Sequence, residues 1–476
     1  MSIEQAQVLQ LEKVMTQKTK QVEVDYRRGR TQITVPDSAV ILDCPDPPIL
    51  VDPATAVRKA LAEPLGVGPL STLVRAGNKV TIAFDAPPRS GKPRQLIIPI
   101  LLEELERCGV GQESVTLVCA GGTHGKIPPR GLADYLGRDL FHAFWPDRLI
   151  NHDCSQDLVV LGRSARGDWV EYNRLVHDSD LLIYLGTIFP MNWGGFSGTG
   201  AVIGLGSARS IASHHTEVIA SASSCHGDHR TQSFRLHKEA INAQIERSIG
   251  KPVFYVDVIT DAKGNIAGVF AGHSPEINEP EWALGERLFQ VETPQADVLV
   301  LGLPQEQVYG STDNPLVAMT YITTPPRTWL RKPLLRRGGV VIALGGSNGR
   351  YNSDLRPTDS EIVGLYDRCM QVGELSQYIE EYLTRPDYLY QYRHCYAYHP
   401  IHGFWLLYEN RWLMDHAAKV IMAGEVTPGP LRRLGITPAS SYDEAWSMAK
   451  DVVGSNPRVV VLPHYWSHLK MQFSVV

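Results

Sequence analysis

The chain has 476 residues, of which 43% are hydrophobic and 20% charged, and its formal net charge is −5. These values are typical of a folded globular protein and exclude a chain dominated by disorder. The length exceeds what one hydrophobic core usually supports, so we expect two domains. The negative charge and the lack of a long basic run exclude the usual signature of a nucleic-acid-binding protein, and we expect no nucleic-acid partner.

The N-terminal segment is polar and carries both signs of charge, so it contains no apolar core of a signal peptide. No later segment reaches the ~18 consecutive apolar residues that a membrane-spanning helix requires. We therefore expect a cytoplasmic protein without a membrane partner. The seven cysteines are scattered and show no CxxC spacing, which favours free thiols over a disulfide framework or a cysteine zinc site.

Short apolar runs rich in β-branched residues recur along the chain and are separated by helix-like stretches. They predict strands buried on both faces, as in a parallel sheet covered by helices. The predicted strands cover residues 79–86, 114–122, 180–186, 252–260, 296–304, 338–346, 418–424 and 457–463. Amphipathic patterns predict helices over residues 96–110 and 237–250. The sequence thus predicts an α/β protein with mainly parallel sheets.

Proline and acidic residues gather at 275–296, between two regions with the pattern of a core. We predict an N-terminal catalytic and cofactor-binding α/β domain over residues 1–288. A C-terminal α/β domain over residues 289–476 would close over the substrate, with the active site in the cleft between the two domains. Ligands of α/β proteins bind at the carboxyl ends of parallel strands, so the residues that follow these strands are the first candidates for function.

The loop FDAPPRSGKPR follows the first predicted strand and contains Asp85, Arg89, Lys92 and Arg94. Proline and glycine restrain this loop, which suits a guanidinium held for a carboxylate or a phosphate. A surface turn with solvated charges explains the same pattern.

His124 follows the second predicted strand through a Gly-Gly-Thr turn. A neutral imidazole at this position can take up and return a proton if a substrate reaches it. The alternative is a histidine that hydrogen-bonds only to the backbone of its own loop.

The segment GGFSGTGAVIGLG at residues 194–206 brings many glycines together. Glycines let the backbone approach a phosphate or a flat ring, with successive N–H groups forming an anion-binding nest. The segment has neither the Gly-Lys-Ser/Thr of a Walker loop nor the glycine spacing of a Rossmann fingerprint. A glycine-rich bend between packed elements is the alternative.

Histidines cluster in two places. The first group comprises His214, His215, His226, His229 and His237; imidazole suits nickel, zinc, copper or iron, but these spacings fit no standard zinc site. The second group, His394, His399 and His402, lies in the aromatic segment 385–405. That segment is either a packed surface of tyrosine and histidine or the lining of a lid.

The order of these motifs is more informative than any one of them. GGTHGKIPP, NHD at residues 151–153, VEYNR, GFSG, HKEAI and NIAGVFAGH follow one another between residues 79 and 275. In this order the chain resembles the lactate racemase family, whose members use a nickel-pincer nucleotide. The resemblance returns more weakly in GGVVIALGG and in residues 431–446.

The resemblance implies a racemase or epimerase of a 2-hydroxy acid, an isomerase acting by hydride transfer. The implied cofactor is nickel held by pyridinium-3,5-bisthiocarboxylic acid mononucleotide, so the implied partners are a small 2-hydroxy acid and the enzymes that make the cofactor. His124 matches the family's first acid/base histidine, and His215 matches the histidine that completes the nickel coordination. Asp85 and Arg89 match a catalytic loop. The cofactor turn is matched by Gly195, Phe196, Ser197 and Gly198, followed by Thr199 and Gly200.

Two positions depart from the family pattern. Pro190-Met191 stands where lactate racemases have a proline-histidine pair, and methionine cannot transfer a proton. Thr199-Gly200-Ala201 stands where they have the lysine that binds the cofactor covalently. We therefore expect a cofactor held non-covalently by the glycine nest, basic side chains and His215. Asn192, His152 or a histidine of the second domain are the candidates for the missing acid/base group.

Two other classes of function stay open. The His214–His237 cluster suggests a zinc- or iron-dependent hydrolase or lyase, and the substitutions at Met191 and Ala201 suggest a homologue that binds a hydroxy acid or a nucleotide without turnover. Trp193 and the aromatic segment 388–405 would admit a bulky or aromatic substrate.

Overall fold

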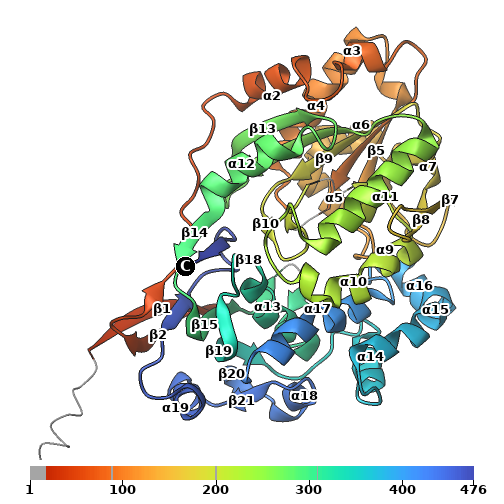
Figure 1. Cartoon of the computed structure of the whole chain (residues 1–476). Helices are drawn as coiled ribbons and strands as arrows, with labels where there is room; N and C mark the ends of the chain where they lie inside the picture. Colours follow the sequence, from red (N-terminus) through yellow and green to blue (C-terminus); the bar gives the residue numbers. More distant parts are fainter. Residues whose placement is uncertain (1–17, 87–88, 199–200, 308) are drawn as a thin grey trace, which may run out of the picture.

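The computed structural model describes residues 18–86, 89–198, 201–307 and 309–476. Its core consists of a six-stranded sheet and an eight-stranded sheet, both flanked by helices (Figure 1). All eight predicted strands are present, four in each sheet, and most of their neighbours run parallel. The predicted α/β class with mainly parallel sheets is therefore confirmed.

The six-stranded sheet has the strand order β13-β12-β9-β4-β5-β6. Only the edge strand β13 runs antiparallel to its neighbour. The strands are β4 (Val80–Asp85), β5 (Val115–Ala120), β6 (Leu149–Asn151), β9 (Leu181–Thr187), β12 (Phe254–Thr260) and β13 (Ile266–Gly272). The parallel pairing places the carboxyl ends of β4, β5 and β9 together at one edge of the sheet, which is the usual place of a ligand site.

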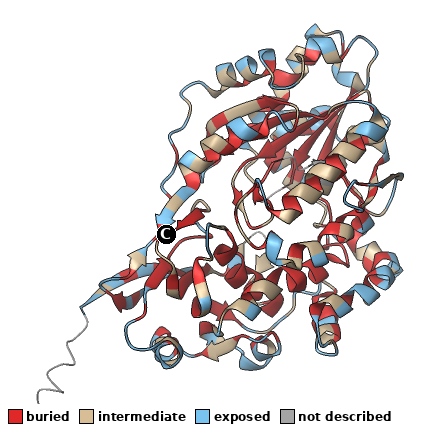
Figure 2. Ribbon diagram, viewed as in Figure 1, coloured by how far each residue is buried: buried red, intermediate tan, exposed pale blue. Residues whose placement is uncertain are grey.

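Helices cover both faces of this sheet because its strands are apolar on both sides. Ile82 and Phe84 of β4 pack into one hydrophobic cluster, whereas Ala83 packs into another. Figure 2 shows the sheet as a buried layer between more exposed helices. The helices of this half are α2 (Pro53–Ala62), α3 (Leu70–Leu73), α4 (Lys92–Arg107), α5 (Pro129–Leu136), α6 (Arg138–Phe144), α7 (Arg174–His177), α8 (Ala201–Gly204), α9 (Ala208–His214), α10 (Glu217–Ala220), α11 (Ser233–Ile249) and α12 (Asn278–Phe289).

The eight-stranded sheet joins the two ends of the chain. Its strands are β1 (Thr19–Arg27), β2 (Gly29–Pro36), β3 (Val40–Ile41), β15 (Ala296–Pro304), β19 (Leu335–Ser347), β20 (Lys419–Val426), β21 (Thr437–Ala439) and β22 (Val459–Leu462). The N-terminal strand β1 pairs with β15, and β3 pairs with β22. The sequence did not indicate this contribution of residues 19–41 to the second sheet, and the domain boundary at residues 288 and 289 stays a prediction.

A helical layer of the second half faces the first sheet across the middle of the molecule, where α10 and α17 lie side by side (Figure 1). The helices of this half are α13 (Pro315–Thr323), α14 (Asp359–Tyr366), α15 (Ser376–Thr384), α16 (Pro386–His394), α17 (His402–His416), α18 (Pro428–Arg433) and α19 (Tyr442–Val453). The C-terminal strand β23 (Gln472–Val475) pairs with β14 (Gln290–Thr293) and β18 (Trp329–Leu330). A separate three-stranded sheet thus ties the C-terminal strand to residues 290–293 and 329–330.

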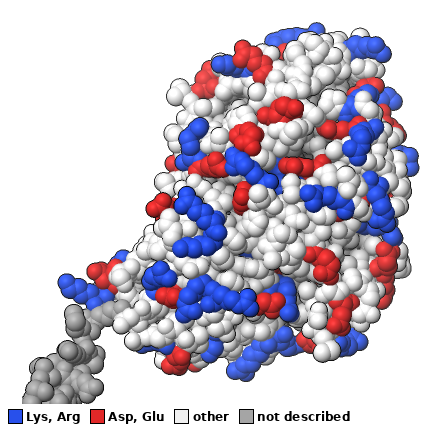
Figure 3. All heavy atoms as spheres, in the orientation of Figure 1, with Lys and Arg blue, Asp and Glu red and all other residues white. Residues whose placement is uncertain are grey.

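Positive and negative side chains are interspersed on the face of the molecule that Figure 3 shows. In the described part of the chain, no helix has the length and the apolar composition to cross a membrane.

Candidate functional site

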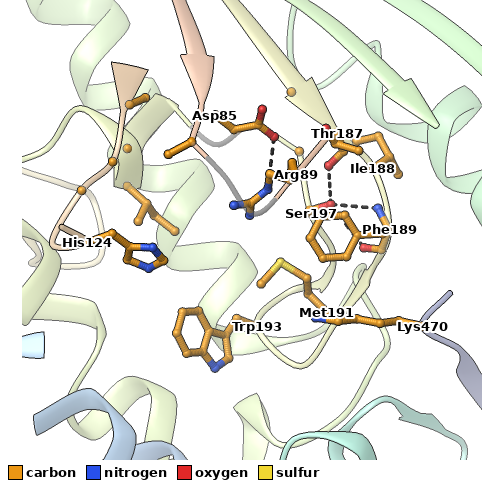
Figure 4. Close-up of a pocket in the computed structure, with 18 of the residues that line it drawn as sticks. Asp85, Arg89, His124, Thr187, Ile188, Phe189, Met191, Trp193, Ser197 and Lys470 are labelled. Carbon is orange, nitrogen blue, oxygen red and sulfur yellow. Dashed lines mark hydrogen bonds and ion pairs between the residues drawn. The ribbon is translucent and has the colours of Figure 1, made fainter. Parts of the chain in front are cut away.

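A cavity of about 390 Å³ lies at the carboxyl ends of β4, β5 and β9. Its wall contains Asp85, Arg89, His124 and His215 from the first half of the chain, and His402, Trp405, Trp466 and Lys470 from the second half. The side chains in Figure 4 converge on this cavity from several separate loops. Ser197 and Gly198 also line the wall, so the structure brings six of the predicted site residues to one place.

Asp85 ends β4 and holds two arginines. Its carboxylate forms an ion pair with Arg94 and a second one with Arg89, with 3.2 Å between Asp85 Oδ2 and Arg89 Nε. Arg94 also donates to Thr187 Oγ1 at 2.8 Å, which ties the ends of β4 and β9 together. Arg94 is buried, whereas Arg89 lies on the cavity wall. Arg89 is therefore the member of this group that is able to meet a ligand.

His124 lies in the turn after β5, and its backbone N–H donates to Gly121 O at 3.0 Å. Its ring packs beside Tyr398 and His402, with centroid separations of 5.3 and 5.1 Å. Burial, followed by repulsion from Arg89 and Arg356, lowers the pKa of His124 to about 3. The environment therefore keeps the imidazole of His124 neutral, with a ring nitrogen that can accept a proton.

His215 follows α9 and is 2% exposed. Its Nδ1 lies 3.1 Å from Ile211 O, so this nitrogen carries the proton and Nε2 has a free lone pair. Burial lowers the pKa of His215 to about 3, which keeps the ring neutral. A neutral histidine whose other nitrogen donates to a backbone carbonyl is the usual form of a metal ligand.

The glycine-rich hairpin is formed by β10 (Pro190–Met191) and β11 (Gly195–Phe196). Gly195 and Gly198 have φ values of +79° and +98°, which favour glycine. Ser197 Oγ fixes the hairpin to the end of β9 by donating to Thr187 O at 2.6 Å, and it accepts from Phe189 N at 2.8 Å (Figure 4). The predicted cofactor residues Thr199 and Gly200 lie outside the described residues.

Lys238 lies beneath this hairpin. It is 4% exposed, it projects from α11, and its Nζ donates to Gly198 O at 2.9 Å. Burial, followed by repulsion from Arg235, lowers the pKa of Lys238 to about 7. The buried carboxyl groups of Asp257 and Glu281 lie close to Gly198 and partly offset this fall. A lysine therefore reaches the residue directly before positions 199–201, although those positions contain no lysine.

Replacing Gly195 with alanine is expected to destabilise the fold more than the same change at Gly77. Both residues have a similar positive φ, +79° and +85°. A Cβ at Gly195 would lie 2.6 Å from Gly227 O, whereas none of the described atoms lies within 4 Å of a Cβ at Gly77. Urea unfolding followed by circular dichroism should show an additional loss of ~1–3 kcal/mol for G195A, the usual cost of overpacking. Equal losses would contradict this account of the hairpin.

Met191 stands where lactate racemases have the histidine of the proline-histidine pair. Its side chain lines the cavity wall and has no proton to exchange. Of the candidates to replace that histidine, His152 uses both ring nitrogens in contacts of 2.9 and 2.8 Å with Gly206 O and Asn173, and Asn192 is hydrogen-bonded to Glu409. His402, a residue of the second half, lies on the cavity wall beside His124.

The histidines between 214 and 237 do not converge. His237 pairs with Asp168 at 2.8 Å, His226 Nδ1 accepts from Asp228 N at 3.2 Å, and His229 packs on Trp282. Among the residues that the structure describes, no three His, Cys, Asp or Glu side chains are placed to bind one metal ion. The geometry gives no support to a zinc or iron centre built from this cluster.

The aromatic segment 385–405 lies partly on the cavity wall and partly away from it. His402 and Trp405 line the cavity. His399 lies away from the cavity, and its Nε2 is hydrogen-bonded to Ser155 Oγ at 2.8 Å. Lys238, Trp466 and Lys470 were not predicted as site residues. Lys238 could have been found from its position on the apolar face of the predicted helix 237–250. No local motif marks Lys470.

The fold and the cavity define an α/β protein with two mainly parallel sheets and a cavity at the carboxyl ends of β4, β5 and β9, and comparisons with known proteins show what the chain is similar to. The family model of the lactate racemase N-terminal domain matches residues 26–227. The lactate racemase of Thermoanaerobacterium thermosaccharolyticum is 26% identical over 264 residues, which are 54% of this chain and 60% of that protein. The aligned part thus spans less than two thirds of that relative. Residues 26–227 therefore resemble the N-terminal domain of lactate racemases.

Solved structures agree with this fold. The structure of the lactate racemase apoprotein from the same organism superposes with a TM-score of 0.66 at 20% identity, covering 94% of this chain and 99% of that one. A Thermotoga maritima protein superposes with a TM-score of 0.55 at 13% identity, covering 91% of this chain and all of the other.

Proposed function

We propose that the protein is a racemase or epimerase of a 2-hydroxy acid that acts by hydride transfer to a non-covalently held nickel-pincer nucleotide. The proposal rests on the position of His124 and His215, which line the wall of the same cavity as the glycine-rich hairpin. Both imidazoles have lowered pKa values. When bound, the nucleotide supplies an acceptor for hydride from the α-carbon of the substrate.

The residues present fit this group. His215 offers a neutral ring nitrogen, and the hairpin offers backbone with positive φ at Gly195 and Gly198. Lys238 supplies a basic side chain beside Gly198. Arg209, the next basic residue after the missing lysine, instead forms an exposed ion pair with Glu380 and does not face the cavity. These contacts favour a nucleotide that is held by coordination and charge without a covalent bond to the chain.

His124 acts on the substrate hydroxyl in this proposal. Its neutral imidazole accepts the hydroxyl proton when the α-carbon loses hydride, and it returns the proton when the ketone is reduced. Phe189, Trp193 and Trp405 line the cavity and exclude water from the reacting atoms. His402 lies beside His124 on the same wall, so proton transfer is expected from one side of the substrate.

The test starts from a single enantiomer of a 2-hydroxy acid that carries deuterium at the α-carbon. The protein is produced together with the enzymes that make the nucleotide, and a panel of lactate, malate and mandelate is followed by chiral chromatography and mass spectrometry. We expect inversion with retention of the α-deuterium, because hydride returns without exchange with water. Binding without inversion would instead support the non-catalytic alternative, and inversion with loss of deuterium to water would contradict hydride transfer.

A further inference from the structure

Two histidines lie one helical turn apart in the segment between β22 and β23. The backbone N–H of His468 donates to His464 O at 2.8 Å, and the N–H of Ser467 donates to the same carbonyl at 3.1 Å. Side chains at positions i and i+4 of such a turn lie on the same face. The imidazole rings of His464 and His468 are accordingly neighbours, with 4.8 Å between their centroids.

Each of the two rings is held by its own carboxylate. His464 Nδ1 lies 2.9 Å from Asp25 Oδ1, and His468 Nδ1 lies 2.8 Å from Asp43 Oδ2. An ionised carboxylate only accepts hydrogen bonds, so both Nδ1 atoms carry a proton and both Nε2 atoms have a free lone pair in the neutral ring. Among the residues that the structure describes, neither Nε2 atom has a hydrogen-bond partner. A histidine oriented in this way by a carboxylate is typical of metal sites.

The two carboxylates are themselves held in place. Asp25 is 4% exposed and accepts from Ser467 Oγ at 2.5 Å, and Asp43 accepts from the backbone N–H of Cys44 at 3.0 Å. One cation, Arg30, approaches Asp25, with 3.7 Å between Nε and Oδ1, and its side chain is 48% exposed. Two carboxylates directly behind the rings therefore favour a doubly charged cation in front of them.

The separation of the rings fits a single ion. A ligating imidazole nitrogen lies ~2.0–2.1 Å from zinc, which places the centroid of its ring roughly 3 Å from the ion. Two such rings at a tetrahedral angle have their centroids roughly 5 Å apart. The observed separation between His464 and His468 is 4.8 Å.

The histidine pair is accessible to an incoming ion. The side chain of His468 is 37% exposed, whereas His464 is 8% exposed. Ser467 and His468 also line the wall of the cavity described above. Two imidazoles fill only two positions around a metal, so water or another ligand would complete the coordination, as it does at metal sites with an open position.

We propose that His464 and His468 form a binding site for a divalent transition-metal ion of the nickel, copper and zinc group, with Asp25 and Asp43 as the outer partners that orient the rings. Imidazole suits these ions, whereas magnesium prefers oxygen ligands. The site does not include His215 and does not depend on the proposed function. With two protein ligands it binds an ion that exchanges with solution and that EDTA removes.

Isothermal titration with NiCl2 tests the site without any requirement for turnover. The full-length protein is produced without an affinity tag and without the nucleotide-making enzymes, and it is treated with EDTA before titration. We expect Asp43→Asn to weaken Ni²⁺ binding by about 10- to 100-fold, the usual effect of an outer partner, and His468→Ala to weaken it further. MgCl2 should compete with neither. Retention of the Ni²⁺ affinity in His215→Ala would show that the two sites are separate.

The matched control is His177→Ala. His177 is also paired with a carboxylate, with 2.8 Å between its Nδ1 and Asp178 Oδ1, and its side chain is 31% exposed. No histidine stands four residues before or after it, so this variant should bind Ni²⁺ as the wild-type protein does. An equal loss of affinity in His177→Ala and His468→Ala would contradict a site formed by the pair.

A spectroscopic measurement counts the ligands directly. Electron paramagnetic resonance of the protein with one equivalent of Cu²⁺ should show coupling to two imidazole nitrogens, and to one in His468→Ala. His464 is nearly buried against Asp25, so circular dichroism must show that each variant is folded. If the wild-type protein binds no Ni²⁺, or if folded His468→Ala binds it with wild-type affinity, the proposal is wrong. The four residues would then form two ion pairs that join the N-terminal strands to the C-terminal segment.

Discussion

Replacing His124 with glutamine is expected to lower the rate of racemisation by ~10²- to 10⁴-fold, the usual contribution of a general acid or base. The amide can form hydrogen bonds in the same place, but it cannot take up the hydroxyl proton. Burial and the neighbouring arginines lower the pKa of the wild-type ring to about 3, so the ring is neutral before the reaction. Initial rates with each enantiomer, followed by chiral chromatography, measure the effect.

The control for this variant is His142→Gln, which makes the same change at an exposed histidine of α6. Unchanged nickel content and an unchanged unfolding midpoint in H124Q would show that the loss is in the chemical step. A racemisation rate within a factor of three of the wild-type rate would show that another group moves the proton, and His402, with its ring 5.1 Å from that of His124, would be the next candidate.

Replacing His215 with alanine is expected to abolish the retention of nickel during gel filtration. The variant removes the ring nitrogen that the hydrogen bond to Ile211 O leaves free. Loss of even an outer partner of a metal ligand costs about 10- to 100-fold in metal affinity, so loss of the ligand itself should exceed that range. Elemental analysis of protein produced with the nucleotide-making enzymes gives the nickel content directly.

His177→Ala is the matched control because it removes an imidazole with a side-chain exposure of 31%, away from the cavity wall. It should retain the wild-type nickel content. Full nickel retention by H215A, with a normal unfolding midpoint, would contradict the assignment of His215 as a ligand.

Much of the fold followed from local pattern. Runs such as residues 79–86 and 180–186 are apolar without alternation, and they form β4 and β9 at the centre of the first sheet because both of their faces meet helices. The N-terminal strands β1 and β2 alternate in burial, and their place beside β15 depends on a contact between residues that lie nearly 280 positions apart. Local pattern has no information about such a pairing.

The site could be predicted where a residue follows a strand. Asp85 and His124 come after β4 and β5, whose parallel pairing places their ends together. Lys470 and His402 come from segments whose position is fixed only by the packing of the second half against the first. Lys238 lies in the middle of a helix, and only the approach of that helix to the glycine hairpin makes it part of the cavity.

The contact between Lys238 and the hairpin changes the interpretation of the missing lysine at positions 199–201. The sequence indicates the loss of an anchoring lysine at positions 199–201, but the structure shows that a lysine from α11 reaches Gly198. The site therefore retains a basic side chain at this turn, although a different element of the chain supplies it.

The measurement that tests the central claim most directly is mass spectrometry of one preparation under native and denaturing conditions, with the protein produced alongside the nucleotide-making enzymes. We predict a native mass that includes nickel and the nucleotide, and a denatured mass equal to that of the bare chain, because neither Ala201 nor Arg209 can form the family's covalent bond and the Lys238 amine is hydrogen-bonded to Gly198 O. A nucleotide adduct that persists on the denatured chain, or a native mass without nickel in protein that inverts a 2-hydroxy acid, would contradict the account.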